Sequence, residues 1–170
     1  MFQWLKNLFI HKQATSKKEK IISALLFFGY IYGLGYASNY EPGEFYKQLI
    51  QPELTPPNWV FPIAWTILFT LIGLSGYYVW NHYSSVIKRR IFTLLYALNG
   101  VLVFLWSYFF FGQQNITTPL FIILGMIIVA ELMILTAFGT NKKAAYLLMP
   151  YLAWILFATY LNASIIVLNG

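Results

Sequence analysis

The chain has 170 residues, of which 59% are hydrophobic and 9% are charged, and its formal net charge is +6. Soluble domains average about 25% charged residues, so this composition excludes an ordinary soluble globule and indicates an integral membrane protein. The basic residues gather at the ends of hydrophobic stretches, where they act as topology signals. We therefore expect the lipid bilayer, and no nucleic acid, as a partner.

The chain contains no cysteine, two histidines and five carboxylates. These counts exclude disulfides and thiolate chemistry, and they leave little for metal binding or acid–base catalysis. We expect no metal site and no obligatory cofactor.

Residues 1–20 are predicted to form a basic N-terminal arm. A short apolar patch precedes the lysines, which is the reverse of the order in a signal peptide. The pattern is typical of an amphipathic arm on the membrane surface, and a disordered segment is the alternative.

Five later stretches are long enough to cross a hydrocarbon core, which takes about 20 residues. They cover residues 21–40, 59–80, 91–111, 119–138 and 146–168. In lipid, helices satisfy their backbone hydrogen bonds without open edges. We predict an all-α membrane protein with a five-transmembrane-helix bundle over residues 21–170.

Charge predicts how this bundle is oriented. With five spans, the N-terminus and loops 81–90 and 139–145 share one side, which carries ten of the eleven Lys and Arg residues. By the positive-inside rule the N-terminus is then cytoplasmic and the C-terminus outside.

The first span carries Gly29, Gly33 and Gly35, a small-residue pattern that allows close approach of helices. We expect packing inside the bundle, with a dimer seam as the second use.

The second span follows a proline-rich lead-in, Thr55-Pro56-Pro57, which cannot be helical. The helix is predicted to begin near Asn58 as its N-cap. Inside it, Trp65 and Phe69 share one face. Packing against lipid or other helices is the commoner use of such a stripe, and a pocket for a flat apolar ligand is the alternative.

Polar groups in the remaining spans need partners. In the third span Asn99 heads a stripe with Val103, Trp106 and Phe110, and its amide must bond another helix or a ligand. In the fourth span Glu131 is the only ionisable group at mid-depth. Such residues usually face the bundle interior, and without an intramembrane cation Glu131 is expected to be protonated and hydrogen-bonded, or to lie at an oligomer seam.

In the fifth span Trp154, Ala158 and Leu161 share a face. The small Ala158 between larger neighbours would leave a recess. Asn162 is a second amide at membrane depth.

Three groups of motifs follow one another along the chain. They are Phe45-Tyr46, Leu49, Pro52, Pro56-Pro57, Trp59, Trp65, Gly73 and Trp80, then Trp106-Ser107 with Phe109-Phe110, then Pro150-Tyr151-Leu152-x-Trp154-x-x-Phe157-Ala158-x-x-Leu161-Asn162. Together they resemble the TspO/MBR family of tryptophan-rich sensory proteins and translocator proteins. The order and spacing are kept over residues 21–169.

The resemblance implies a five-helix membrane bundle, commonly a homodimer, that binds protoporphyrin IX or haem between its helices under the first loop. It implies a location in the bacterial cytoplasmic membrane. The ligand-binding positions that it implies are Tyr46, Pro56, Phe61, Trp65, Phe69, Asn99, Phe109, Trp154 and Ala158. Trp65 and Trp154 are similar to tryptophans tied to light-dependent porphyrin breakdown.

The chain also departs from the family pattern. Phe45 and Leu54 replace two pattern tryptophans, Gln51 replaces a lysine, and Val103 replaces the second amide of a Gln-x-x-x-Asn pair. Three functions stay open: a porphyrin-binding sensor or regulator, a transporter of porphyrins or other amphipathic molecules, and a slow light- and oxygen-dependent porphyrin-degrading enzyme.

Overall fold

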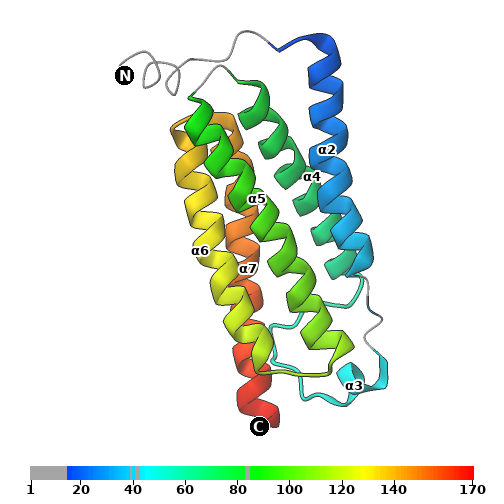
Figure 1. Cartoon of the computed structure of the whole chain (residues 1–170). Coiled ribbons are helices and arrows are strands. Elements are labelled where there is room, and N and C mark those ends of the chain that lie inside the picture. Colours follow the sequence, from blue (N-terminus) through cyan, green and yellow to red (C-terminus); the bar gives the residue numbers. More distant parts are fainter. Residues whose placement is uncertain (1–14, 39, 41–42, 83–84) are drawn as a thin grey trace.

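The computed structural model describes residues 15–38, 40, 43–82 and 85–170. Within them, five helices long and apolar enough to cross a membrane form the bundle of Figure 1. The elements are α2 (Lys17–Ala37), α3 (Gly43–Gln48), α4 (Val60–Asn81), α5 (Val86–Ser107), the π-helix η1 (Tyr108–Gly112), α6 (Thr118–Phe138) and α7 (Lys142–Asn169). The predicted all-α, five-helix membrane bundle is confirmed.

Three helices begin four or five residues before the predicted spans, α2 at Lys17, α5 at Val86 and α7 at Lys142, and the N-cap of α4 also differs. Helix α2 begins at Lys17, within the predicted arm, because Ser16 and Glu19 form a capping box: the Ser16 hydroxyl accepts from the Glu19 amide at 3.2 Å, and the Glu19 carboxylate accepts from the Ser16 amide at 2.8 Å. Helix α4 begins at Val60 with Trp59 as its N-cap and without a side-chain cap bond. The assignment of Asn58 as N-cap is therefore wrong. Residues 1–14 of the arm lie outside the described residues.

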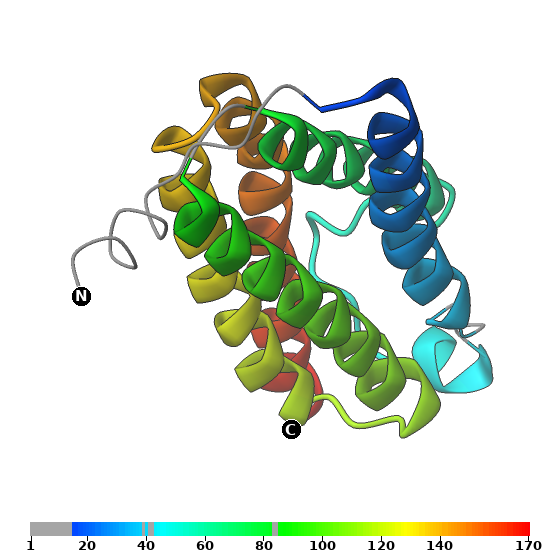
Figure 2. The same ribbon diagram turned by 45° about the horizontal axis from the view of Figure 1, so that its top comes forward.

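The helices are arranged so that α2 and α6 lie at opposite edges of the bundle, as both ribbon views show (Figures 1 and 2). Helix α2 packs mainly against α4, α6 packs against α5 and α7, and α4 packs against α7. The gaps are filled by a core of aliphatic and aromatic side chains that includes Phe92, Met126 and Ile155.

Buried hydrogen bonds between helices hold these packing partners in register. The Tyr96 hydroxyl donates to the Phe27 carbonyl at 2.8 Å, which links α5 to α2, and the Ser75 hydroxyl donates to the Ala144 carbonyl at 2.9 Å, which links α4 to α7. A polar group that is removed from water is costly without a partner, so sliding of either helix would be penalised.

The three glycines of α2 lie in two different environments. A Cβ at Gly35 would collide with the ring of Phe69, so this glycine permits the close approach of α2 and α4. Gly29 and Gly33 are exposed, and a Cβ on either would meet nothing within 4 Å. The expectation that all three pack inside the bundle is wrong for Gly29 and Gly33, because α4 meets the other side of the helix.

Glu131 lies on the outer face of α6. Its neighbours Ala130 and Met133 are fully buried in the face of α6 that meets the bundle, whereas Glu131 is on the exposed face. The interior position that is usual for such residues does not apply to Glu131, since this face of α6 points away from the other helices. The oligomer seam, the other alternative, stays a prediction.

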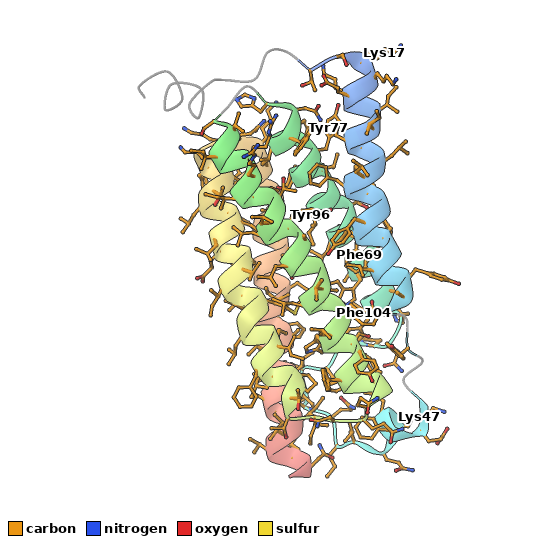
Figure 3. The ribbon with its side chains drawn as sticks, in the orientation of Figure 1. Lys17, Lys47, Phe69, Tyr77, Tyr96 and Phe104 are labelled. Carbon is orange, nitrogen blue, oxygen red and sulfur yellow. The ribbon has the colours of Figure 1, made fainter. Side chains whose placement is uncertain are left out.

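The two ends of the bundle differ in charge. The end at which α2, α5 and α7 begin carries eight basic residues of the described part: Lys17, Lys18, Lys20, Lys88, Arg89, Arg90, Lys142 and Lys143. Lys47, in α3, lies at the other end, as Figure 3 shows for Lys17 and Lys47. The long first loop and its helix α3 are at this second end (Figure 1).

Candidate functional site

A cavity of about 540 Å³ lies in the half of the bundle next to the first loop. Its walls come from the end of α2, the first turns of α4, the end of α5 with η1, and the last turns of α7. The lining residues are Gly35, Ser38, Tyr40, Tyr46, Gln51, Thr55, Asn58, Phe61, Pro62, Trp65, Phe69, Val103, Trp106, Ser107, Phe110, Phe111, Ala158, Leu161, Asn162 and Ile165. The volume falls within the range of about 300–1,000 Å³ that is usual for small-molecule sites.

The first loop contributes one side of this cavity through Tyr46, Gln51, Thr55 and Asn58. Hydrogen bonds tie the loop to the bundle. The Ser107 hydroxyl donates to the Ser38 carbonyl at 2.6 Å where the loop leaves α2. At the far side of the loop the Asn169 side chain bonds both main-chain groups of Ile50.

Two tryptophans form aromatic walls. Trp65 lies against Phe69, with ring centroids 5.3 Å apart and planes inclined by 35°. Trp106 stacks on Phe110, with centroids 5.3 Å apart and planes inclined by only 13°. Broad aromatic faces of this kind suit a flat apolar ligand.

The π-helix η1 brings extra rings to the same place. Within it Phe110 and Phe111 both line the cavity, and the ring of Tyr46 from the loop contacts each of them, at centroid distances of 6.3 and 5.7 Å. A π-turn is wider than an α-turn and is frequent at functional sites. Here it lets two consecutive phenylalanines reach one cavity.

Four buried polar atoms at the cavity have no hydrogen-bond partner. They are the Gln51 Oε1, Thr55 Oγ1, Asn162 Oδ1 and Trp106 Nε1 atoms. The opposite end of the Asn162 amide donates to the Ile116 carbonyl at 2.8 Å, so its Oδ1 is held in place as a free acceptor. The four groups are one indole N–H, one hydroxyl and two amide oxygens, and less than 1 Å² of each atom is accessible. Because buried polar groups are nearly always paired, each could bond a polar molecule in the cavity after a small shift of its side chain.

The cavity carries no formal charge. Among the described residues that line it there is no Asp, Glu, Lys, Arg or His. Its titratable groups are the phenols of Tyr40 and Tyr46, and burial raises the pKa of Tyr46 above the usual tyrosine value, which keeps this phenol neutral. Elsewhere in the described part of the chain, no group of three His, Cys, Asp or Glu side chains is placed to hold a metal ion.

Comparison with known proteins agrees with this architecture. Residues 21–168 match the model of the TspO/MBR family. The chain belongs to the TspO/MBR family. It is 38% identical to the tryptophan-rich protein TspO of Archaeoglobus fulgidus over 158 residues, which covers 89% of this chain and 97% of the relative.

Two further relatives of this TspO/MBR protein carry names that bear on function. It is 33% identical to the tryptophan-rich sensory protein of Cereibacter sphaeroides over 129 residues, which covers 76% of this chain and 79% of the relative. It is 31% identical to the human translocator protein over 118 residues, which covers 69% of this chain and 70% of the relative.

The structure brings five of the predicted site residues together at the cavity. These are Tyr46, Phe61, Trp65, Phe69 and Ala158. They come from the first loop, from α4 and from α7, so three segments far apart in the sequence meet there.

Four other predicted residues lie outside the lining: Pro56, Asn99, Phe109 and Trp154. The Asn99 Oδ1 accepts from the Tyr151 hydroxyl at 2.7 Å, which is the interhelical alternative raised for this amide. Trp154 contacts Phe61, a lining residue, in an edge-to-face arrangement with centroids 6.0 Å apart and planes inclined by 73°. The ring of Phe109 contacts Tyr108 at a centroid distance of 5.3 Å.

Trp106 and Phe110 are cavity residues that the predicted site did not contain. A signal for them existed, because both belong to the stripe that Asn99 and Val103 begin. The family motif pointed to Phe109 instead, and the π-turn that rotates Phe110 and Phe111 toward the loop has no recognisable sequence signature. The first-loop residues Gln51 and Thr55 were missed because side chains in a loop do not follow the helical repeat from which the other candidates were read.

Proposed function

We propose that this integral membrane protein binds a tetrapyrrole in the cavity and acts as a sensor or regulator of porphyrin levels. The observation that carries the proposal is the cavity itself: it is walled by two indoles and several phenylalanines, it has no formal charge, and it holds four buried polar atoms without partners. A porphyrin is a flat aromatic ring with polar substituents, and it would use both features.

Protoporphyrin IX, which has no metal, fits this lining better than haem does, because haem iron needs an axial ligand. The described lining residues offer no imidazole, thiol or thioether as an axial ligand, and of its two phenols Tyr46 is kept neutral by burial. Recognition would rest on stacking and hydrogen bonding to the macrocycle. The name of the Cereibacter sphaeroides relative, a tryptophan-rich sensory protein, supports a sensing role.

The test is a titration of the purified protein with protoporphyrin IX and, in parallel, with haem. We expect quenching of tryptophan fluorescence and a shifted Soret band with protoporphyrin IX, with haem bound no more tightly. Failure of both signals with protoporphyrin IX in a folded protein would refute the proposal.

Transport is a second function that one observation favours, the name of the human relative, a translocator protein. Flux of protoporphyrin IX into proteoliposomes that carry this protein, above the flux in protein-free liposomes, would distinguish transport from sensing. Illumination of the complex with a search for ring-opened products tests the third possibility, light-dependent breakdown.

We further propose that the protein resides in a bacterial cytoplasmic membrane with its N-terminus in the cytoplasm. The eight basic residues gathered at one end of the described bundle support this orientation. It would place the cavity in the outer half of the membrane. A C-terminal alkaline phosphatase fusion should then be active and a C-terminal fluorescent protein dark, and the reverse pattern would invert the assignment.

A further inference from the structure

A second hollow lies between α2 and α4, on the outside of the bundle. It measures about 350 Å³ and shares no lining residue with the cavity beside the first loop. Two of its lining residues, Lys17 and Tyr77, lie toward the opposite end of the bundle from that loop (Figure 3). We call this hollow the α2–α4 groove. It is a site of its own, and it does not depend on what the cavity binds.

The inner part of the α2–α4 groove is apolar. Its walls are Ile21, Ala24 and Phe28 of α2 and Leu74 of α4, and the small Ala24 leaves room between larger side chains. The ring of Phe28 is packed so closely on α4 that a Cβ at Gly73 would collide with it. A hydrocarbon chain matches walls of this kind, because all its contacts there are with carbon atoms.

The length of the α2–α4 groove matches one leaflet of a bilayer. From Lys17 to Phe28, the two ends of its lining on α2, the helix rises by about 16 Å at about 1.5 Å per residue. The hydrocarbon core of a bilayer is about 30 Å thick, so one leaflet occupies about 15 Å. A lipid tail has this length, whereas a spanning helix of another protein would need a surface along the whole of α2.

Two lysines stand at the outer end of the α2–α4 groove. Lys17 and Lys20 are both exposed, and among the described residues neither ammonium group has a hydrogen-bond or ion-pair partner. The carboxylate between them in the sequence, that of Glu19, does not line the groove and accepts from the Ser16 amide at 2.8 Å. The outer end therefore attracts a negative charge.

We propose that the α2–α4 groove binds one anionic phospholipid from the leaflet at the lysine-rich end of the bundle. The lipid phosphate meets Lys17 and Lys20, and one acyl chain lies along Ala24 and Leu74. Basic pockets between membrane helices bind anionic head groups in this way. Tyr77 adds a ring that suits the boundary between head groups and chains. In the orientation proposed above this is the cytoplasmic leaflet, whose surface is negative.

Native mass spectrometry of the full chain in detergent tests the head-group preference. Phosphatidylglycerol should bind at least about fivefold more tightly than phosphatidylcholine with the same acyl chains, which corresponds to about one charge contact at a membrane surface. Lys17→Gln/Lys20→Gln should abolish this preference. Lys142→Gln/Lys143→Gln removes two exposed charges from the same end but outside the groove, and should retain it.

Three results of this experiment would overturn the proposal. The first is equal affinity of the wild-type protein for the two lipids, and the second is the same loss of preference in both double variants. The third is displacement of phosphatidylglycerol by glycerol phosphate, which carries the phosphate without acyl chains, because the site would then bind a free anion.

Filling the α2–α4 groove gives a second measurement that leaves the charges in place. Ala24→Phe should weaken phosphatidylglycerol binding several-fold, because the added ring takes the space of the acyl chain. Leu25→Phe, next in the chain, 69% exposed and outside the groove, is the matched control and should bind as the wild type does. Thermal unfolding verifies that both variants are folded. Unchanged binding by folded Ala24→Phe would show that no acyl chain occupies the groove.

Discussion

The side-chain amide of Asn169 bonds both main-chain groups of Ile50: its Nδ2 donates to the Ile50 carbonyl at 3.0 Å, and its Oδ1 accepts from the Ile50 amide at 2.8 Å. The two residues are 119 positions apart in the chain. A helix end thus holds the loop that forms one side of the cavity.

We predict that Asn169→Leu loosens this loop and speeds ligand exchange. Both hydrogen bonds to the loop are lost, together with the one that Asn169 donates to the Ile165 carbonyl at 2.8 Å. Each bond to the loop is worth about 0.5–1.5 kcal/mol, so the rate constant for porphyrin dissociation should rise several-fold. Stopped-flow recovery of tryptophan fluorescence measures it. Val167→Ala, on the same turn of α7 and 82% exposed, is the control and should leave the rate unchanged. An unaltered rate in Asn169→Leu would show that the ligand does not leave past the loop.

Trp65 and Trp154 should differ in their effect on porphyrin affinity. Trp65 lines the cavity, whereas Trp154 is not among the lining residues and contacts one of them, Phe61. Trp65→Ala should weaken binding about tenfold, since stacking adds roughly 0.5–1.5 kcal/mol to the buried area that is lost. Trp154→Ala should have the smaller effect in a fluorescence titration. Trp4, outside the matched residues 21–168, provides the control Trp4→Ala. A larger loss for Trp154→Ala would contradict this placement.

Trp106→Phe tests the unpartnered indole N–H without removing the aromatic face. The ring should still stack on Phe110, while the indole N–H, one of two donors in this set beside the Thr55 hydroxyl, disappears. If the ligand accepts from this group, the dissociation constant should rise by about 2- to 12-fold, the equivalent of one hydrogen bond. Equal affinity of wild type and variant would mean that the N–H faces no ligand atom.

The buried pair of Asn99 and Tyr151 should affect stability and leave binding unchanged. Tyr151→Phe removes the hydroxyl that donates to Asn99 at 2.7 Å, and an unpaired buried amide oxygen costs about 1–3 kcal/mol. The midpoint of thermal unfolding in detergent should fall, and the double variant Asn99→Leu/Tyr151→Phe should recover part of the loss. Since neither residue lines the cavity, porphyrin affinity should be unchanged in the folded variants. A loss of affinity without a loss of stability would show that Asn99 contacts the ligand.

Porphyrin affinity should vary little between about pH 7 and about pH 9, because the described lining residues include no Asp, Glu, Lys, Arg, His or Cys. Burial raises the pKa of the Tyr46 phenol. Folding therefore favours the protonated form, and this contribution to stability is fully present below about pH 10 and is lost as the pH rises through the folded-state value. Titrations at several pH values check this. A steep change near pH 7 would require an ionisable group at the ligand.

The membrane class and the five spans could be predicted from the sequence, because an apolar stretch of about 20 residues without charges has one stable form in lipid. The positions of lysine and arginine in the sequence also predicted which end of the bundle is rich in positive charge. The order and spacing of motifs identified the family resemblance, and with it Tyr46, Phe61, Trp65, Phe69 and Ala158 as candidates for one site.

Which face of each helix looks inward was decided only by the tertiary structure. In a soluble protein the apolar face is the buried one, but in lipid both faces are apolar, so periodicity does not distinguish them. For this reason the sequence left Glu131 between an interior position and an oligomer seam, and the structure places it on the outer face of α6. Trp154, expected at the ligand, contacts Phe61 and is not among the residues that line the cavity. The π-turn at Tyr108–Gly112 and the fold of the first loop, which bring Phe110 and Gln51 to the cavity, arise from packing between distant segments that no local pattern encodes.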